Sequence, residues 1–287
     1  MHIITIPTAV HNETFRWQLD LFWFGQRSLY GRSAHKRTHA VIIRRNGPTD
    51  RRVQVLDWHS SIPHTLCESF FDEGLMAFRL LALPLNTQAG LQQILPQFAD
   101  DDVLEVIDCD MVPFRAIDYT IGDNELIVCN AYERWHLRSL TKNRHVIAQY
   151  FDNGGGYYNG GFVPIIGKAK TFGMLLPDWI AIHIDILLKP YPHPIHWWAG
   201  MFALQAACQR CKIRMIAQDC CYIHGVTKLS EEQHIGHYSS PSDPFNKFAY
   251  PNVDRRRLDR RNLFYATIHK WLVQRPHRRY PVESRMG

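Results

Sequence analysis

The sequence lacks the features of a secreted or membrane-spanning chain. Residues 1–7 contain no basic stretch followed by a long apolar run, so we expect no signal peptide. The most apolar later window, residues 174–188, is interrupted by a proline and by charged and polar side chains, so we expect no membrane span. The seven cysteines are odd in number, which without a secretory signal favours reduced thiols over a disulfide framework. These absences predict a cytoplasmic protein, of a bacterial cell or of a phage-infected host.

The sequence also lacks internal repeats and long low-complexity tracts, and its charge is spread unevenly. Of its 287 residues, 46% are hydrophobic and 21% charged, a composition typical of a globular protein rather than a disordered one. The net charge is +6, but residues 251–287 hold ten Lys or Arg and three Asp or Glu, so this part carries +7 and residues 1–250 carry −1. A uniformly basic, histone-like protein is therefore excluded.

Apolar, β-branched runs alternate with helical patterns through the first half of the chain. We expect strands at residues 2–10, 40–44, 104–107, 125–129, 162–166 and 213–216, and helices at 14–30, 68–83, 90–98, 197–210 and 258–273. Alternation of this kind predicts an α/β fold with a mainly parallel central sheet. In such sheets, ligands bind at the carboxyl ends of the strands.

Two aspartates directly follow one of these expected strands. Asp108 and Asp110 are two residues apart, at the end of an apolar run. In an extended chain such side chains share a face, and paired carboxylates suit a hard cation such as Mg²⁺ or Mn²⁺. A cation of this kind neutralises a departing diphosphate. Taken alone, the tripeptide is more often a solvated acidic turn.

A second motif lies in residues 157–162. Asn159 offers a donor and an acceptor to a sugar hydroxyl, as recognition of a sugar requires. Gly160 and Gly161 allow the backbone to approach a ligand closely, although a β-bulge or tight turn needs the same glycines.

A third motif, His-Gly-x-x-Lys, follows an expected strand. His224 can complete a metal shell as a neutral imidazole, and Lys228 can meet a departing phosphate as a point charge. The chain holds 16 histidines, so the position of this one, just past a strand, is what singles it out.

In this order, the strand with Asp-x-Asp, the Tyr-Asn-Gly-Gly-Phe segment and the His-Gly-x-x-Lys segment resemble a GT-A-fold glycosyltransferase. The order is similar to that in the glycogenin and galactosyltransferase-like families, and in the plant hydroxyproline O-arabinosyltransferase and peptidyl-serine galactosyltransferase group. The resemblance covers residues 1–230 and implies one GT-A-type, Rossmann-like catalytic domain. It implies a hexosyl- or pentosyltransferase with a nucleotide-sugar donor, UDP-sugar in the first place, and Mn²⁺ or Mg²⁺ at the diphosphate.

Carried onto this chain, the resemblance implies a role for each motif. The residues implied to hold the metal are Asp108, Asp110 and His224. Those implied to bind the sugar and diphosphate of the donor are Asn159, Gly160, Gly161 and Lys228. Those implied to lie near the nucleotide base, along the first strand, are Thr5, Pro7 and Ala9.

The chain departs from the resemblance at the expected catalytic side chain. Several of these families have an acidic or amide pair at the start of the helix after the sugar pocket, whereas residues 196–201 contain no carboxylate. Of the available acids, we take Asp185 and Asp219 as the catalytic candidates. An inverting enzyme needs a carboxylate or His as general base, and a retaining one can rely on the diphosphate, so both outcomes stay open.

The cysteines offer a competing interpretation of His224. Cys208 and Cys211 have the spacing of a zinc-binding pair, and Cys220 and Cys221 follow nearby. However, Cys208 falls inside an expected helix, and adjacent residues at a strand end point to opposite faces. Buried, reduced thiols are therefore the default expectation.

The C-terminal extension, residues 231–287, is loop-rich and basic and ends in the expected helix. Its arginines, at 255–257 and 260–261 among others, form either a solvated charged face or a contact with the phosphate backbone of DNA. Two acceptors therefore stay open: a hydroxymethylated base in DNA, flipped into the cleft as in phage-type DNA modification, or a protein or glycan hydroxyl. The alternative function is a non-catalytic nucleic-acid-binding module on a GT-A-like body.

Overall fold

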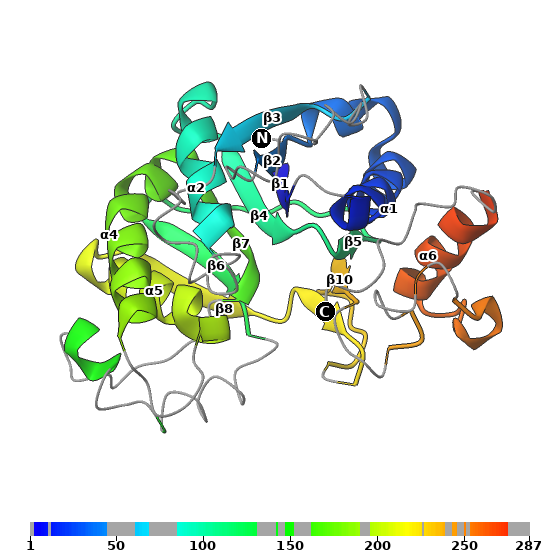
Figure 1. Cartoon of the computed structure of the whole chain (residues 1–287). Helices are drawn as coiled ribbons and strands as arrows, with labels where there is room; N and C mark the ends of the chain where they lie inside the picture. The colour runs from blue at the N-terminus through cyan, green and yellow to red at the C-terminus, as the bar shows by residue number, and fades with distance from the viewer. Residues whose placement is uncertain are drawn as a thin grey trace.

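The structure of the chain is a computed structural model (Figure 1). It describes residues 3–10, 13–44, 61–68, 85–130, 142, 147–151, 162–189, 196–225, 227–238, 243–245, 250 and 253–274. The fold consists of a central sheet with helices on both faces, and a smaller sheet with a C-terminal helix beside it.

The central sheet confirms the expected α/β fold with mainly parallel strands. Its members are β1 (Ile3–Val10), β2 (Ala40–Arg44), β3 (His64–Glu68), β4 (Val103–Asp108), β6 (Glu125–Cys129), β7 (Phe162–Lys168) and β8 (Arg214–Gln218). In the described part of the chain the order is β3-β2-β1-β4-β7-β6-β8, and every neighbouring pair is parallel except the two that involve β7. Because helices cover both faces of the sheet, its strands consist largely of consecutive apolar residues.

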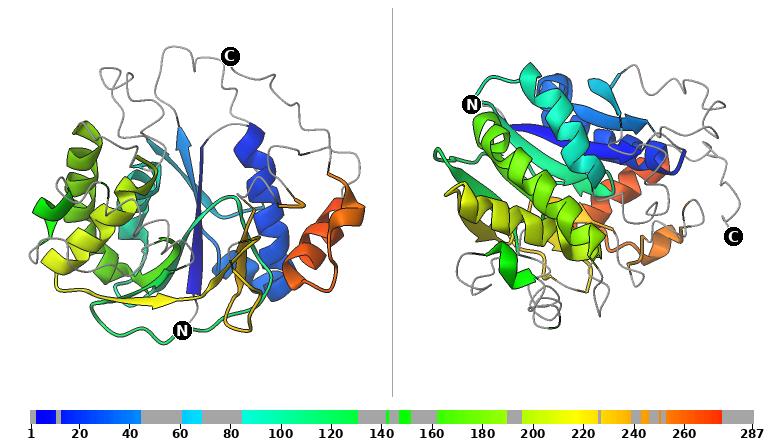
Figure 2. Two further views of the ribbon diagram at one scale, coloured as in Figure 1. Left: turned by 90° about the horizontal axis from the view of Figure 1, so that it is seen from below. Right: turned by 60° about the vertical axis from the view of Figure 1, so that its left-hand side comes forward.

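The helices divide between the two faces of this sheet (Figure 2). The face covered by α2 (Leu85–Ile94), α4 (Ala169–Leu188) and α5 (His196–Arg210) holds the largest hydrophobic cluster, to which β4 contributes Leu104 and Val106. The opposite face packs against α1 (Glu13–Tyr30), and there β4 contributes Ile107. The alternation along β4 follows from the two-residue period of a strand.

Helix α1 ends where its sequence predicts. Gly31 follows the last residue, Tyr30, and has a φ of +55°, a left-handed conformation that glycine adopts without steric cost. A short 3₁₀ helix, Gly31–Lys36, then leads to β2.

Helix α4 is the most apolar of the described helices. By length and composition it could cross a membrane, with 20 residues and a mean hydropathy of 1.4. Half of that window is buried in the protein, where Phe172, Leu175 and Ile186 join the cluster on the sheet. Packing of this kind is also what a core helix of a globular protein shows.

The small sheet and the last helix form one packed unit with the body. The sheet consists of β5 (Met111–Pro113), β10 (Ile235–His237) and β9 (Cys221–Ile223), in that order. Behind it, α6 (Leu263–Gln274) packs against α1 in a shared hydrophobic cluster. Because β10 lies between two strands of the body, the expected boundary between residues 230 and 231 falls inside this unit.

The C-terminal helix begins later than its sequence pattern predicts. Residues 255–257 form a 3₁₀ turn, η6 (Arg255–Arg257), and the side chain of Asn262 caps α6 by accepting a hydrogen bond from the backbone N–H of Phe264 at 3.0 Å. Ser, Thr, Asp and Asn are the residues that cap helices in this way, so the helix starts at Leu263.

Two other expected helices differ from the structure. Glu68, expected to start one, is the last residue of β3, and residues 69–83 lie outside the described part of the chain. The helix expected at 90–98 is α2, followed by a short 3₁₀ helix, Leu95–Gln97.

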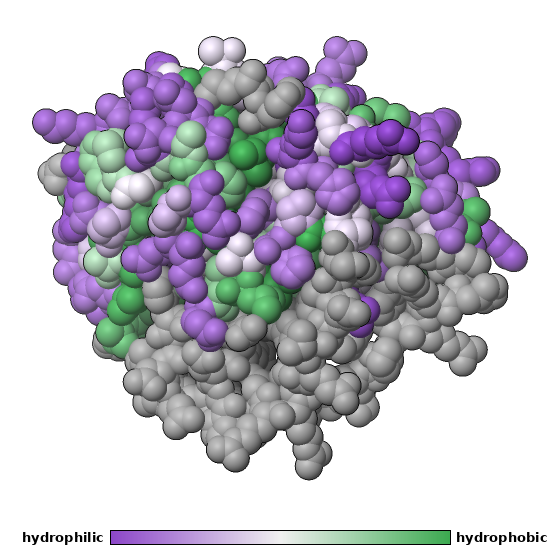
Figure 3. All heavy atoms as spheres, turned by 90° about the horizontal axis from the view of Figure 1, so that it is seen from above, coloured by the Kyte–Doolittle hydropathy of each residue, from purple (hydrophilic) through white to green (hydrophobic). Residues whose placement is uncertain are grey.

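Figure 3 shows one face of the molecule, where hydrophilic residues cover most of the coloured surface and apolar ones are exposed between them.

Candidate metal site at the carboxyl end of β4

The strand order of the central sheet reverses between β1 and β4. From β1 the chain proceeds outward to β2 and β3, and then returns to place β4 on the other side of β1. The connecting helices α1 and α2 lie on opposite faces, so the carboxyl ends of β1 and β4 form a switch point of the kind where open α/β sheets bind ligands. Thr8 of β1 is in register with Asp108 of β4 at this point.

Asp108 and Asp110 lie at this switch point, at the carboxyl end of β4. Asp108 is the last residue of β4, and Cys109 and Asp110 form a turn rather than a continuation of the strand. Cys109, between them in the sequence, is buried, and its thiol donates to Oε1 of Gln18 on α1 at 3.1 Å. Asp110 is 6% exposed, so its charge lies in a site that largely excludes water.

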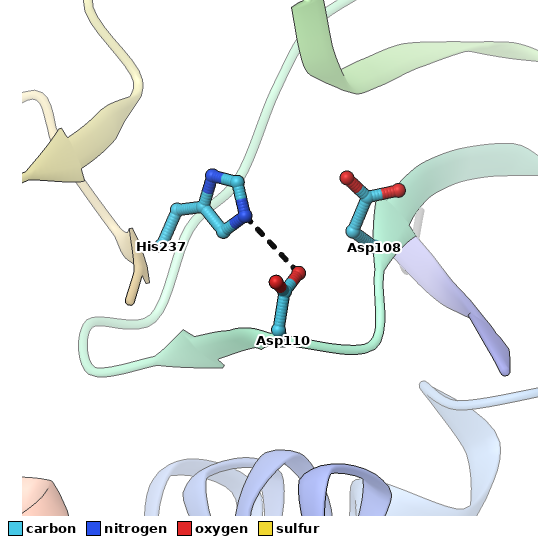
Figure 4. Close-up of side chains that lie close together, drawn as sticks. All are labelled: Asp108, Asp110 and His237. Carbon is cyan, nitrogen blue, oxygen red and sulfur yellow. Dashed lines mark ion pairs between the residues drawn. The ribbon is translucent and has the colours of Figure 1, made fainter. Parts of the chain in front are cut away.

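His237 completes a cluster with these two aspartates. β5 starts directly after Asp110 and pairs antiparallel with β10, which sets His237 opposite Met111. As a result Nε2 of His237 lies 3.1 Å from Oδ1 of Asp110 (Figure 4). One ligand atom from each of Asp108, Asp110 and His237 lies within 4.8 Å of the other two.

The chemistry of these three side chains fits a divalent cation. Two ligands of one Mg²⁺-sized ion, each about 2.1 Å from it, are at most about 4.2 Å apart, a separation similar to those in this cluster. Carboxylate oxygens suit Mg²⁺ and Mn²⁺, and an imidazole favours Mn²⁺ within that pair. Three protein ligands leave positions open for oxygens of a substrate.

His224, the third ligand implied by the resemblance, lies elsewhere. It follows β9, and β10 separates β9 from β5, so His224 is two strands away from the strand that follows Asp110. Its Nδ1 is 2.9 Å from the hydroxyl of Tyr265 on α6. The structure therefore brings His237, and not His224, to the aspartate pair.

A buried carboxylate, Asp243, lies behind the site. It is 4% exposed and its Oδ1 accepts hydrogen bonds from the backbone N–H of Phe245 at 2.8 Å and from the hydroxyl of Tyr265 at 3.1 Å. Burial raises the pKa of Asp243 to about 6, and the two hydrogen bonds and the nearby His224 and His237 oppose this only in part.

Replacing Asp243 with Asn should change how the stability depends on pH. A carboxyl with a raised pKa in the folded state contributes stability that is complete below its ordinary pKa of 3.8 and is lost as the pH rises through about 6. The wild-type free energy of unfolding, relative to that of Asp243→Asn, should therefore fall by about 2 kcal/mol between pH 4 and pH 7.5. Urea unfolding at several pH values measures this, and parallel profiles for the two proteins would contradict it.

The three residues expected near the nucleotide base are buried under α1. Thr5 donates from its hydroxyl to Glu105 of β4 at 2.8 Å and accepts from Gln26 of α1 at 3.0 Å. His234 bonds to the same buried carboxylate, and Pro7 and Ala9 share this covered face.

Thr8 is the residue of β1 that shares the face of Asp108. Its Oγ1 is buried and has no hydrogen-bond partner in the described structure. Side chains alternate between the two faces of a strand, so Thr8 points to the opposite face from its neighbours Pro7 and Ala9, which were expected at the nucleotide base. This alternation is a sequence signal that could have indicated Thr8.

The two catalytic candidates differ in their surroundings. Asp219 follows β8 at the carboxyl edge of the sheet and accepts a hydrogen bond from Gln233 at 2.9 Å. Burial raises the pKa of its carboxyl, and the Gln233 bond opposes this. Asp185 lies on α4, accepts from Lys189 at 2.8 Å and from Tyr150 at 2.6 Å, and these bonds lower the pKa of its carboxyl.

The remaining expected residues contribute little to the described site. Lys228 is exposed beyond β9, and Asn159, Gly160 and Gly161 lie outside the described residues. The zinc interpretation finds no support, because the Asp108–Asp110–His237 cluster is the one candidate metal site among the described residues.

The two cysteine pairs of the zinc interpretation lie in different hydrophobic clusters of the fold. Cys208 is buried in α5, while Cys211 bonds to Asp178. Cys220 and Cys221 are buried near Cys129.

Sequence reasoning missed His237 because it lies in a segment that reads as a loop. Residues 235–238, Ile-Gly-His-Tyr, do contain a weak strand signal, two apolar residues that flank Gly236 and His237. The pairing of β10 with β5 joins residues more than 100 positions apart, and no local pattern records it.

Comparisons with known proteins return structural similarities only. No protein-family model matches the chain, and no curated protein matches its sequence. A structure of the galactosyltransferase LgtC with donor and acceptor sugar analogues is similar with a TM-score of 0.48 and 12% identity, over 88% of this chain and 92% of that one.

Two further solved structures are similar with slightly lower TM-scores. An active-site mutant of LgtC has a TM-score of 0.46 and 12% identity, over 85% of this chain and 89% of that one. The bifunctional glycosyltransferase WbbM has the same score and identity, over 85% of this chain and 46% of that one. At these TM-scores the similarity assigns no family.

Proposed function

We propose that the protein is a metal-dependent glycosyltransferase, which moves a sugar from a nucleotide-sugar donor to an acceptor hydroxyl. The observation that carries the proposal is the cluster of Asp108, Asp110 and His237 at the point where the strand order reverses. A crevice at such a point is where open α/β sheets bind nucleotides. A divalent cation held there supplies charge neutralisation for the diphosphate that leaves the sugar.

The residues around the cluster fit this chemistry. Thr8 offers a buried, unpartnered hydroxyl on the face of Asp108, suited to a phosphate or ribose oxygen. Asp219 is the candidate for proton transfer at the acceptor, because it lies at the carboxyl edge of the sheet, where burial raises the pKa of its carboxyl. Asp185, paired with Lys189, is the weaker candidate.

Hydrolysis of nucleotide sugars tests this function. We expect the purified chain to release nucleoside diphosphate from one member of a panel of UDP-, GDP-, ADP- and CDP-sugars in the presence of Mn²⁺, and EDTA to abolish the release. UDP-sugars are the first donors to test. A chain that neither binds nor hydrolyses any donor with Mn²⁺ present would overturn the proposal. Nucleic-acid binding in such a chain would favour the non-catalytic alternative.

The third metal ligand has a separate test. His237→Ala should weaken Mn²⁺ binding at least about tenfold, because it removes a ligand. His224→Ala is the matched control and should change the affinity by less than about threefold, since His224 contacts Tyr265 instead. Calorimetric titration with MnCl₂ alone measures both. An equal loss in the two variants, or a larger loss in His224→Ala, would contradict the assignment of His237.

A further inference from the structure

An arginine-rich turn connects the small sheet to α6. Over residues 254–261 the sequence reads Asp-Arg-Arg-Arg-Leu-Asp-Arg-Arg, and all five arginines are exposed. Only Arg261 of the five makes an ion pair within the described residues, with Asp259 at 3.1 Å. Four guanidinium groups in this turn therefore keep their full donor capacity for an external anion.

The turn is ordered by its own backbone and by one apolar anchor. Asp254 caps η6 by accepting from the backbone N–H of Arg256 at 3.0 Å, and Asp259 accepts from that of Arg261 at 3.1 Å. Leu258, between the two arginine groups, is 4% exposed and packs in the cluster shared with α1 and α6. The arginine backbone is thus held before any ligand binds, which reduces the entropic cost of binding.

The surface of this turn is open and cationic. Arg256, Arg257, Arg260 and Arg261 line a shallow depression with Leu258 and Asp259. A 3₁₀ turn has three residues per turn, so consecutive arginines in η6 project in different directions. Arginine side chains that project in different directions can bind several anionic groups at once, rather than a single one.

We propose that this arginine turn is a docking surface for the phosphate backbone of duplex DNA. Guanidinium groups bind phosphate oxygens in a bidentate manner, and several of them together give sequence-independent, salt-sensitive affinity. The apolar residue of the turn is buried, whereas a surface that binds a bilayer inserts exposed apolar side chains. Charge complementarity thus favours a nucleic acid over a membrane.

The turn lies beside α6, on the side of the molecule away from the central sheet (Figure 1). It leads directly into α6, where Tyr265 bonds to His224 and to Asp243, behind His237. In naming DNA as the acceptor the inference rests on the proposed function, and it favours the hydroxymethylated base over a protein or glycan hydroxyl.

Binding of fluorescein-labelled 20-base-pair duplex DNA, measured by anisotropy without metal or donor, tests the docking surface. Arg256→Gln/Arg257→Gln/Arg260→Gln should weaken binding by at least tenfold at 100 mM NaCl. The slope of log K against log [NaCl] should become shallower by about 2 to 3, since each lost phosphate contact removes about 0.9. Arg27→Gln/Arg32→Gln/Lys36→Gln removes the same charge from exposed positions on α1 and the 3₁₀ helix after it, and should change binding by less than threefold.

Three outcomes would overturn this inference. They are no binding of duplex DNA at 50 mM NaCl, equal losses in the two triple variants, and tighter binding of duplex RNA or of anionic vesicles than of DNA. Because DNA binding is measured without donor and donor hydrolysis without DNA, failure of one is distinct from failure of the other.

Discussion

Replacing Asp110 with Ala should lower the rate of Mn²⁺-dependent donor hydrolysis by about three orders of magnitude. Asp110 is buried, lies next to Asp108 and His237, and is one of three side chains that can share one cation. Metal neutralisation of a leaving group contributes several kcal/mol to a transition state, which corresponds to a factor of this size. Nucleoside diphosphate release at saturating donor measures the rate, and calorimetry with MnCl₂ should show the loss of metal binding in parallel.

Two further variants make this result specific. Asp110→Asn keeps the shape of the side chain and removes its charge, so it should show the same loss with an unchanged thermal midpoint. Asp100→Ala removes an exposed carboxylate from the turn before β4 and should keep wild-type activity. Full activity in Asp110→Asn, or activity that survives the loss of metal binding, would refute the metal site.

Trp271→Ala should lower the free energy of unfolding of the whole protein by about 3–5 kcal/mol. Trp271 is 1% exposed, with its ring centroid 6.4 Å from that of Trp17 on α1 and 5.6 Å from that of Tyr250. The truncation leaves a cavity between the body and α6. Because the two share this packing, both should be destabilised together, and the loss of stability should appear in a single unfolding transition. Urea unfolding followed by fluorescence and by circular dichroism measures it.

The exposed Val273 on the same helix provides the control. Val273→Ala, at a side chain that is 51% exposed, should change the stability by less than about 0.5 kcal/mol. If residues 231–287 were a separate domain, Trp271→Ala would instead produce a second transition and leave the unfolding of the body unchanged. A loss of Mn²⁺ affinity in Trp271→Ala is expected too, because α6 packs behind β10 and Gly236 of that strand faces Phe264.

Local sequence patterns anticipated most of the central sheet. Strands 40–44 and 125–129 were expected with the bounds that the structure has, because uninterrupted β-branched runs bounded by turn residues are a local signal. Strand β3 and helix α4 were not expected. In α4, Pro177 interrupts an otherwise apolar pattern, yet the helix continues through it because α4 packs against the sheet and α5.

The sequence by itself determined the α/β class, the aspartate pair at a strand end and the basic character of the C-terminal part. Each of these follows from residues adjacent in the chain, whose spacing alone sets the hydrophobic period, the turn or the local charge. Only the tertiary structure decided that His237 joins the aspartates, that Thr8 is in register with Asp108, and that β10 and α6 pack against β5, β9 and α1. The reason is physical: these contacts depend on strand register and on the pairing of β10 between β5 and β9, which residues far apart in the chain establish together.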